Sequence, residues 1–268
     1  MNKKNIYISN LCWSKRDNDK VIEYLRKEGI SGIDLAPLKY FESWKNIIAN
    51  SKKLKIFFNK NKIKINALQG IFYKTKYNIF NIKDKKKITK HFELIIQLCK
   101  IFKTKKIILG SSNFRDPGNL NAKQADRIFS NYFKSLNKLL KKNNIFLCIE
   151  TIPKYYKEKY IFEFSHLKNL VKKINSSNIK INFDTSVYHF QKFNKNKFLK
   201  NIKSIKNIQI SQPIFDYFDK PTTNNLNFID YIKDNDSFNE ISLEMIDKRF
   251  NRKKFEISIF NIKKFFNI

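Results

Sequence analysis

Cysteine is scarce in this sequence, and its placement gives no disulfide pattern. Cys12, Cys99 and Cys148 are odd in number and far apart, and no C-x-x-C pair occurs. Two of the three lie within apolar stretches, where a free thiol behaves as a small hydrophobic residue. These features exclude a disulfide framework and favour a reducing compartment.

Long hydrophobic runs are also missing. No stretch reaches the ~18 apolar residues that a transmembrane helix needs. The first ten residues, MNKKNIYISN, have a basic start but no apolar segment of the kind found in a signal peptide. We therefore expect a cytoplasmic protein without a membrane partner.

Glycine numbers only five residues, which limits the phosphate-binding loops that the chain can form. Neither G-x-G-x-x-G nor G-K-[ST] occurs, so the sequence contains no glycine-rich phosphate cradle. A substrate without phosphate, or one whose anion is bound by lysine and arginine, is compatible with this absence.

Acidic residues and arginine are few, whereas lysine is abundant. The formal net charge is +32, yet only six of the 55 basic residues are arginine, the better ligand for phosphates and bases. The lysines are spread over every expected helix, and Lys, Asn, Ile and Phe are all encoded by A/T-rich codons. We interpret the charge as compositional bias and expect no specific nucleic-acid partner; binding to a polyanion is the alternative.

What the sequence does contain is a regular alternation of short apolar runs and longer lysine-rich segments with helical spacing. Parallel strands covered by helices are typical of such a pattern, and eight units in 268 residues favour an α/β fold of the (β/α)8 TIM barrel type. No linker interrupts the chain, so we expect one domain over residues 1–268. The expected strands are 6–11, 32–36, 63–69, 106–110, 145–150, 179–184, 208–211 and 240–244.

Helix boundaries can be predicted at several places. Asp17 is a candidate N-cap for a helix that ends at Gly29, and residues 84–102 place Ile88, Phe92 and Ile95 on one face. Residues 252–266 are expected to form a closing helix. The segment 214–239 is irregular, and its helix is the least well defined by the pattern.

Three acids follow apolar strands in the second half of the chain: Glu150, Asp184 and Glu244. The C-terminal ends of barrel strands converge at one mouth, where TIM-barrel active sites lie. Carboxylates brought together there would raise one another's pKa unless a cation neutralised them. Carboxylate and amide oxygens suit divalent ions such as Mn²⁺ or Mg²⁺.

The chain resembles the xylose-isomerase-like TIM barrels of the sugar phosphate isomerase/epimerase family. The resemblance covers most of the chain and is carried by the order and spacing of several short pieces. These are SNLCW, GIDLAPLKYF, LQGIFY, GSSNFRD, IETIPKYY, INFDTS, IQISQP and ISLEM.

This resemblance implies a metal site and a reaction. The metal ligands would be Glu150, Asp184, Gln209 and Glu244, and the ion would be Mn²⁺, Mg²⁺ or Co²⁺. Glu150 and Glu244 would act as acid and base on opposite faces of a small sugar. One would remove the proton beside the carbonyl to give an enediolate, and the other would return a proton from the other side.

The resemblance also assigns substrate contacts at the active face. Gln69 would contact a sugar hydroxyl and Arg115 a substrate anion, and for each the alternative is a hydrogen bond within a loop. His189 would reach the site from the loop after the sixth strand, although a histidine at a strand end is more often incidental.

Two departures from the family pattern bear on the activity. Gln209 stands where the family has a histidine ligand, and Val187 stands where it often has a second histidine. A neutral amide is a weaker ligand than imidazole for softer ions. The alternatives are a barrel with altered or lost catalysis and, less favoured, an enzyme like the apurinic endonucleases, whose zinc sites need more histidines than this chain has. The sequence leaves a homo-oligomer open.

Overall fold

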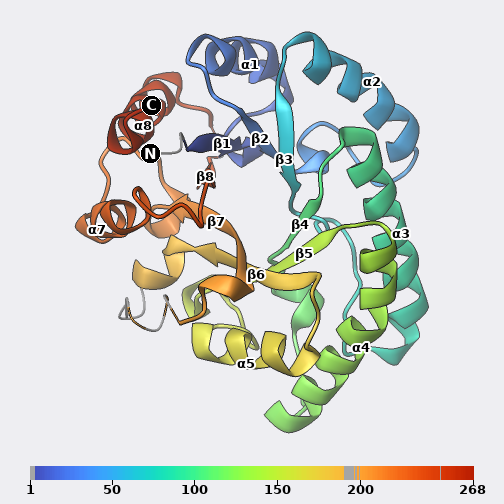
Figure 1. Ribbon diagram of the computed structural model, residues 1–268. Coiled ribbons are helices and arrows are strands. Elements are labelled where there is room, and N and C mark those ends of the chain that lie inside the picture. Colours follow the sequence, from blue (N-terminus) through green and yellow to red (C-terminus); the bar gives the residue numbers. More distant parts are fainter. Residues whose placement is uncertain (1–3, 190–195, 197, 199, 248) are drawn as a thin grey trace.

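Eight parallel strands close into a barrel in the order of the sequence (Figure 1). The computed structural model describes residues 4–189, 196, 198, 200–247 and 249–268. The strands are β1 (Asn5–Ser9), β2 (Gly32–Leu35), β3 (Lys64–Leu68), β4 (Lys106–Leu109), β5 (Phe146–Glu150), β6 (Ile179–Asp184), β7 (Ile205–Ser211) and β8 (Glu240–Glu244). The predicted (β/α)8 fold is confirmed.

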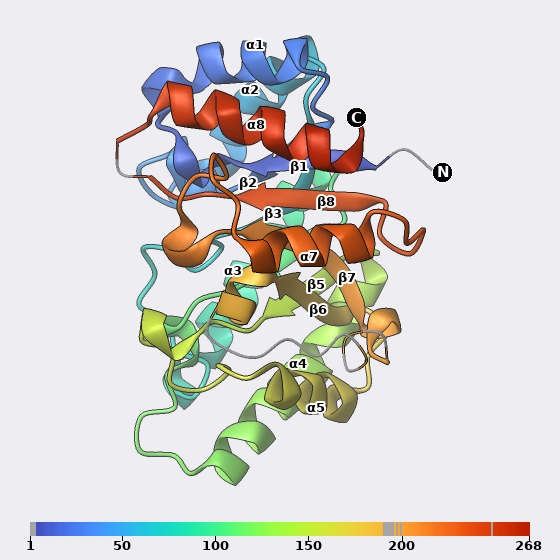
Figure 2. The ribbon, with the colours of Figure 1, turned by 90° about the vertical axis from the view of Figure 1, so that its left-hand side faces the viewer.

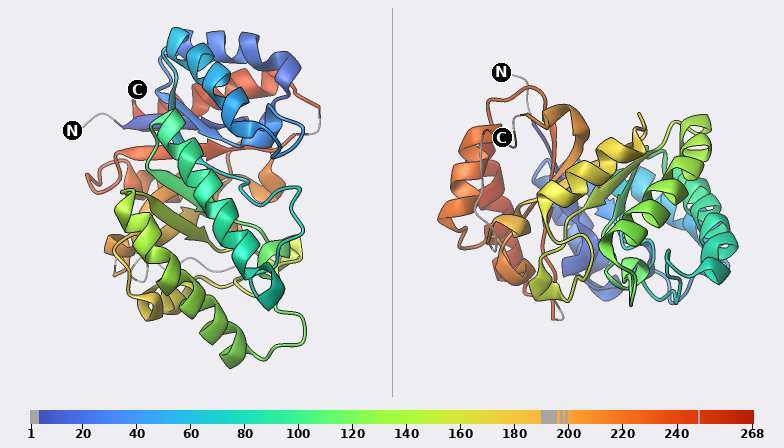
Figure 3. Two further views of the ribbon diagram at one scale, coloured as in Figure 1. Left: turned by 90° about the vertical axis from the view of Figure 1, so that its right-hand side faces the viewer. Right: turned by 90° about the horizontal axis from the view of Figure 1, so that it is seen from below.

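Helices surround the barrel and cover the outer faces of its strands (Figures 1 and 3). Their apolar stripes pack against the strands, as expected of amphipathic helices on a parallel sheet. They are α1 (Asn18–Lys27), α2 (Ile47–Lys60), α3 (Lys85–Phe102), α4 (Ala122–Lys142), α5 (Phe164–Ile174), α7 (Thr223–Ile232) and α8 (Arg252–Phe266). None of the described helices is long and apolar enough to span a membrane.

The sequence-based boundaries agree closely with the structure. The closing helix α8 has the predicted bounds, and α1 begins directly after Asp17, although the Asp17 side chain makes no capping hydrogen bond. The largest difference is in β7, which begins at Ile205 rather than residue 208, because the polar Asn207 lies within the strand.

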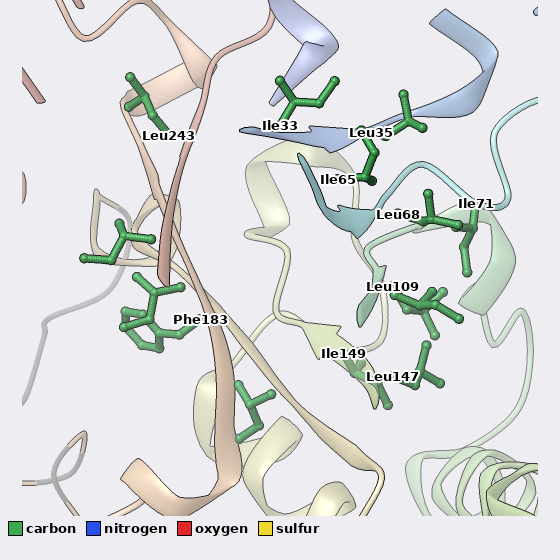
Figure 4. Packing of buried hydrophobic residues seen from close by; sticks show 14 of the residues in the cluster. Ile33, Leu35, Ile65, Leu68, Ile71, Leu109, Leu147, Ile149, Phe183 and Leu243 are labelled. Atoms are coloured by element: carbon green, nitrogen blue, oxygen red, sulfur yellow. The ribbon is translucent and has the colours of Figure 1, made fainter. Parts of the chain in front are cut away.

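Polar residues alternate with apolar ones along β6, β7 and β8. The apolar members, such as Phe183 and Leu243, belong to the hydrophobic core and lie around the barrel in Figure 4. The polar members, such as Asn182, Gln209 and Ser242, are nonetheless buried. Since successive side chains of a strand point to opposite faces, the barrel interior is largely polar and the main apolar core lies between strands and helices.

All strands run in the same direction, so the barrel has two distinct ends (Figure 2). The loops that follow the strands lie on the left of Figure 2, and the loops that lead into the strands lie on the right. The three acids singled out in the sequence belong to the first of these ends.

Gly32 allows β2 to approach β3 closely at the start of both strands. A Cβ atom at this position would lie 2.1 Å from the backbone oxygen of Lys64, a separation that no real side chain adopts. The contact is with backbone of a paired strand, so the neighbour cannot move aside without disturbing the sheet.

We expect Gly32→Ala to destabilise the barrel by about 3 kcal/mol, the upper range for an overpacked site. Gly118→Ala is the matched control. It has no atom within 4 Å of the new Cβ and only a positive φ of 57° to overcome, which costs about 1 kcal/mol. Urea unfolding measures both free energies, and equal losses would contradict the steric explanation.

Candidate active site

The structure brings Glu150, Asp184 and Glu244 together at the C-terminal ends of β5, β6 and β8. In the strand register Asp184 lies beside Gln209, and Ser211, two residues further along β7, lies beside Glu244. Asp184 is also close enough to Glu244 to raise the pKa of its carboxyl, in addition to the larger effect of burial. Three acidic side chains distant in the sequence therefore share one small region of the barrel mouth.

Burial and the charge of neighbouring carboxylates raise the pKa of both glutamates. Burial raises the pKa of Glu150 to about 7, and the negative charge of Asp184 adds to the effect. Burial also raises the pKa of Glu244 well above its usual 4.5, with further contributions from Asp184 and Glu150. A carboxyl group that titrates near neutral pH, as Glu150 does, can both accept and donate a proton, as general acid–base catalysis requires.

Two neighbours fix the carboxyl group of Glu150. The Nδ2 of Asn182, which lies opposite Glu150 on β6, donates to Oε2 at 2.7 Å. On the other side the carboxyl lies against Gly110, which directly follows β4: a Cβ there would be 1.5 Å from Oε1. The acid therefore occupies space that any other residue at position 110 would fill.

A chain of amide groups runs from Glu150 across the barrel mouth. The Nδ2 of Asn182 also donates to Oε1 of Gln209 at 2.5 Å. Gln209 in turn donates to Oε1 of Gln69 at 3.2 Å, and Gln69 donates to Oγ of Ser9 at 2.6 Å. Gln69 and Gln209, both singled out in the sequence, are thus linked to the acid site by direct hydrogen bonds.

A second branch of this network runs from Asn182 to a buried lysine. Asn207 donates to Oδ1 of Asn182 at 2.8 Å, and the Nζ of Lys106 donates to Oδ1 of Asn207 at 3.0 Å. Lys106 also pairs with Glu240 at 3.0 Å. An ammonium group can only donate, so it orients Asn207 and then Asn182, whose N–H groups must point towards Glu150 and Gln209.

Asp184 has its own hydrogen-bond donors. The hydroxyl of Ser211, on β7, donates to Oδ1, and the backbone N–H of Ser186 donates to the same atom at 2.7 Å. Hydrogen bonds to the charged form stabilise a carboxylate. Of the three acids, Asp184 is therefore the one best supported as an anion.

Arg115 lies beside the site rather than in it. Its guanidinium is fully buried, forms an ion pair with Glu158 at 2.9 Å and donates from Nη1 to the backbone oxygen of Glu150 at 2.8 Å. These contacts join the loop after β4 to the loop after β5. In this structure Arg115 makes the loop contact, one of the two roles that the sequence left open.

The three histidines lie in different parts of the structure, and Val187 stands at the position where the family often has another histidine. Val187 is buried in the turn after β6. His189 ends the same 3₁₀ turn, Thr185–His189, but its side chain lies outside the described residues, so its proposed role stays a prediction. His91 bonds to the backbone oxygen of Ile71 at 2.6 Å, and His166 bonds to Asp126 at 2.9 Å; both are structural contacts.

Two aromatic side chains from the loops after β5 and β7 pack together near the acids. Tyr156, after β5, is close enough for Asp184 and Glu244 to raise the pKa of its phenol in addition to burial, and its ring lies 5.0 Å from that of Phe215, after β7. Ile214 and Phe215 both adopt a left-handed conformation, with φ of 55° and 56°. Such strain in a β-branched residue is uncommon and is concentrated at functional sites.

The sequence analysis did not single out Asn182, Gly110, Ser211 or Tyr156. Asn182 carried a usable signal, because it precedes Asp184 by two residues and must therefore share its face of the strand. Ser211 carried the same signal, because it follows Gln209 by two residues on β7. Gly110 gave no such signal, since its importance depends on the Glu150 side chain of the neighbouring strand. Tyr156 gave no signal either, since the conformation of a loop cannot be predicted from its sequence.

The charge of the three acids suits a divalent cation, because a cation would compensate Glu150 and Glu244, whose pKa values are raised by burial and by the charge of Asp184. Their present geometry is not that of a closed site: within the described residues, no group of three or more His, Cys, Asp and Glu is arranged to hold a metal ion. The side-chain oxygen of Gln209 already accepts from Asn182. Glu150, Asp184 and Glu244 are thus the residues that could hold a cation after reorienting.

Comparison with known proteins agrees with this architecture. A sequence model of the family described as "Xylose isomerase-like TIM barrel" matches residues 22–267. The chain belongs to this family. A search of curated proteins found no match.

Solved structures of the family have the same fold at low sequence identity. 3-Keto-D-glucoside 4-epimerase from E. coli has 12% identity and a TM-score of 0.79, with 98% of this chain and 100% of that chain covered. D-Allulose 3-epimerase from Methylomonas sp., solved in complex with D-allulose, has 13% identity and a TM-score of 0.76, with 98% of each chain covered. The IOLI protein, solved with a zinc atom, has 15% identity and a TM-score of 0.69, with 98% and 96% covered.

The raised pKa of Glu150 predicts how stability depends on pH when no divalent cation is present. The carboxyl is protonated in the folded chain at pH values where the unfolded chain, with its usual pKa of 4.5, has lost the proton. Stability therefore falls as pH rises from 4.5 to about 7, and the penalty is complete above that range. Glu150→Gln removes the penalty.

In EDTA at pH 8, we expect Glu150→Gln to raise the melting temperature by about 6–12 °C, equivalent to about 3 kcal/mol. At pH 4 the variant and the wild type should melt together. Glu93→Gln, on the exposed face of α3, is the control and should change neither value. A variant less stable than wild type at pH 8 would contradict the burial of an unfavourable charge.

Proposed function

We propose that this chain is a divalent-metal-dependent isomerase or epimerase of a sugar or sugar derivative. The observation that carries the proposal is a pair of glutamates, the half-buried Glu150 and the buried Glu244, whose pKa values are both raised and whose strands flank Asp184 and β7. Two proton carriers at one mouth are what the removal and return of a proton beside a carbonyl require.

The individual residues have the following roles in the proposed reaction. One glutamate, ionised, removes the proton from the carbon beside the carbonyl, while the other, protonated, returns a proton to the opposite face. Asn182 holds Glu150 in place through its N–H group, and Gln69 is proposed to contact a sugar hydroxyl. Arg115 positions the Glu150 backbone; the direct substrate contact first expected of it is not needed here.

Glu150, Asp184 and Glu244 would hold the cation, with Gln209 as a fourth, neutral ligand if its oxygen is released from Asn182. When bound, the cation would polarise the substrate carbonyl and stabilise the negative charge that develops on its oxygen. The zinc atom in the IOLI structure and the sugar in the D-allulose 3-epimerase structure are properties of those proteins and support this proposal by analogy.

The test is proton–deuterium exchange of a panel of ketoses and aldoses in heavy water, after metal analysis of the purified protein. Exchange at the carbon beside the carbonyl is expected in the presence of Mn²⁺, Mg²⁺ or Co²⁺. Glu150→Gln and Glu244→Gln should each lower it by at least about 100-fold, the usual contribution of a general base. Glu93→Gln is the matched control, and undiminished exchange in either site variant would remove the mechanism.

A second candidate is a barrel in which the chemistry has changed or been lost. It is favoured by Gln209, whose amide is fixed between Asn182 and Gln69 and replaces the ligand expected in the family. This candidate predicts no tight divalent binding and no exchange by the wild type. If Gln209→His then tightened metal binding, loss of the third ligand would be the cause.

A further inference from the structure

A lysine-rich groove lies at the end of the barrel opposite the acids. Its volume is about 760 Å³, within the range of small-molecule sites. The residues leading into β3 and β4 form its sides, and the first residues of β5, β7 and β8 complete it. This is the end of the barrel seen on the right of Figure 2.

The groove exists because β3 and β4 separate at this end. Among the described residues, Leu68 and Ile107 are the one register pair that these two strands share, and both lie beyond the first residues of their strands. Below that pair the hydroxyl of Thr104 donates to the backbone oxygen of Asn66 at 2.6 Å and takes the place of a regular strand contact. The gap is therefore built into the fold.

Its lining is much more basic than the chain as a whole. Seven of the sixteen lining residues are lysines, whereas lysine makes up fewer than one in five residues of the sequence. The single acid, Glu240, is already paired with Lys106 at the floor. The lysines that remain without a carboxylate among the lining residues are Lys55, Lys62, Lys64, Lys103, Lys105 and Lys206.

These lysines are close enough to repel one another. Lys55 is half-buried beside Phe102 and donates to its backbone oxygen at 3.4 Å. Burial lowers the pKa of Lys55, and the charge of Lys103 lowers it further. Lys206 lies over the ring of Phe146, 5.0 Å from its centroid, so apolar surface also contributes to the groove.

We propose that this groove binds a small anion that carries more than one phosphate group. Concentrated positive charge with no acid to balance it favours such a ligand, and lysine binds phosphate as a point charge. The concave shape and the scarcity of arginine favour a small polyphosphate over a nucleic-acid duplex. The proposal does not rest on the proposed function, since none of the lining residues belongs to the acid cluster. Lys106 at the floor does begin the hydrogen-bond chain that reaches Asn182, so it is left unchanged in the test below.

Isothermal titration calorimetry with inorganic tripolyphosphate at physiological salt tests the proposal. The groove variant combines Lys62→Asn, Lys64→Gln and Lys103→Asn. Asparagine suits positions 62 and 103, where φ is 57°. The control combines Lys85→Gln, Lys86→Gln and Lys90→Gln on exposed positions of α3, and it removes the same net charge.

We expect the groove variant to bind at least about tenfold more weakly, the loss of roughly one hydrogen-bonded charge pair, and the control to change affinity less than twofold. Equal weakening of both variants, or no binding by the wild type, would overturn the proposal. So would tighter binding of a duplex oligonucleotide through the same three lysines. If the triple variant fails to fold, Lys103→Asn alone, with Lys90→Gln as control, decides the question by the same comparison.

Discussion

The arrangement of the acid site depends on the hydrogen-bond donor at the other end of the barrel. Lys106 can only donate, and its ammonium group sets the direction of Asn207, which sets that of Asn182. Each amide orients the next one, so that Asn182 presents its N–H group, and not its carbonyl oxygen, to Glu150. Buried polar networks of this kind are stabilising only when every member is satisfied, which explains why amides, rather than more carboxylates, fill the barrel interior.

The fold holds the acids in an arrangement that is unfavourable for their charged forms. Glu244 is buried and Glu150 half-buried near Asp184, and the raised pKa values of both glutamates show that the folded chain does not favour three charges there. A bound proton relieves this repulsion, and the cation of the proposed function would relieve it as well. The strained residues Ile214 and Phe215, in the turn after β7, fit the same interpretation, because strain is kept where function requires a particular shape.

Much of the fold and part of the site could be predicted from the sequence. The alternation of short apolar runs with helical segments predicted eight strands, and the ends of those runs placed Glu150, Asp184 and Glu244 at one mouth. Contacts that cross between strands could not be predicted. The environment of Glu150 depends on Gly110 and Asn182, which precede and follow it by more than thirty residues, and the contacts of Arg115 with Glu158 join two loops whose paths no local pattern specifies.

The sequence by itself determined the parallel barrel, because the period of apolar residues fixes which elements form and which of their faces are buried. It also determined that acids stand at strand ends. Only the tertiary structure decided that the alternating polar residues of β6, β7 and β8 point into a closed interior, that their amides align from Lys106, and that β3 and β4 part to leave a basic groove. The physical reason is that hydrogen-bond direction and strand separation depend on partners brought together by barrel closure, not on neighbours along the chain.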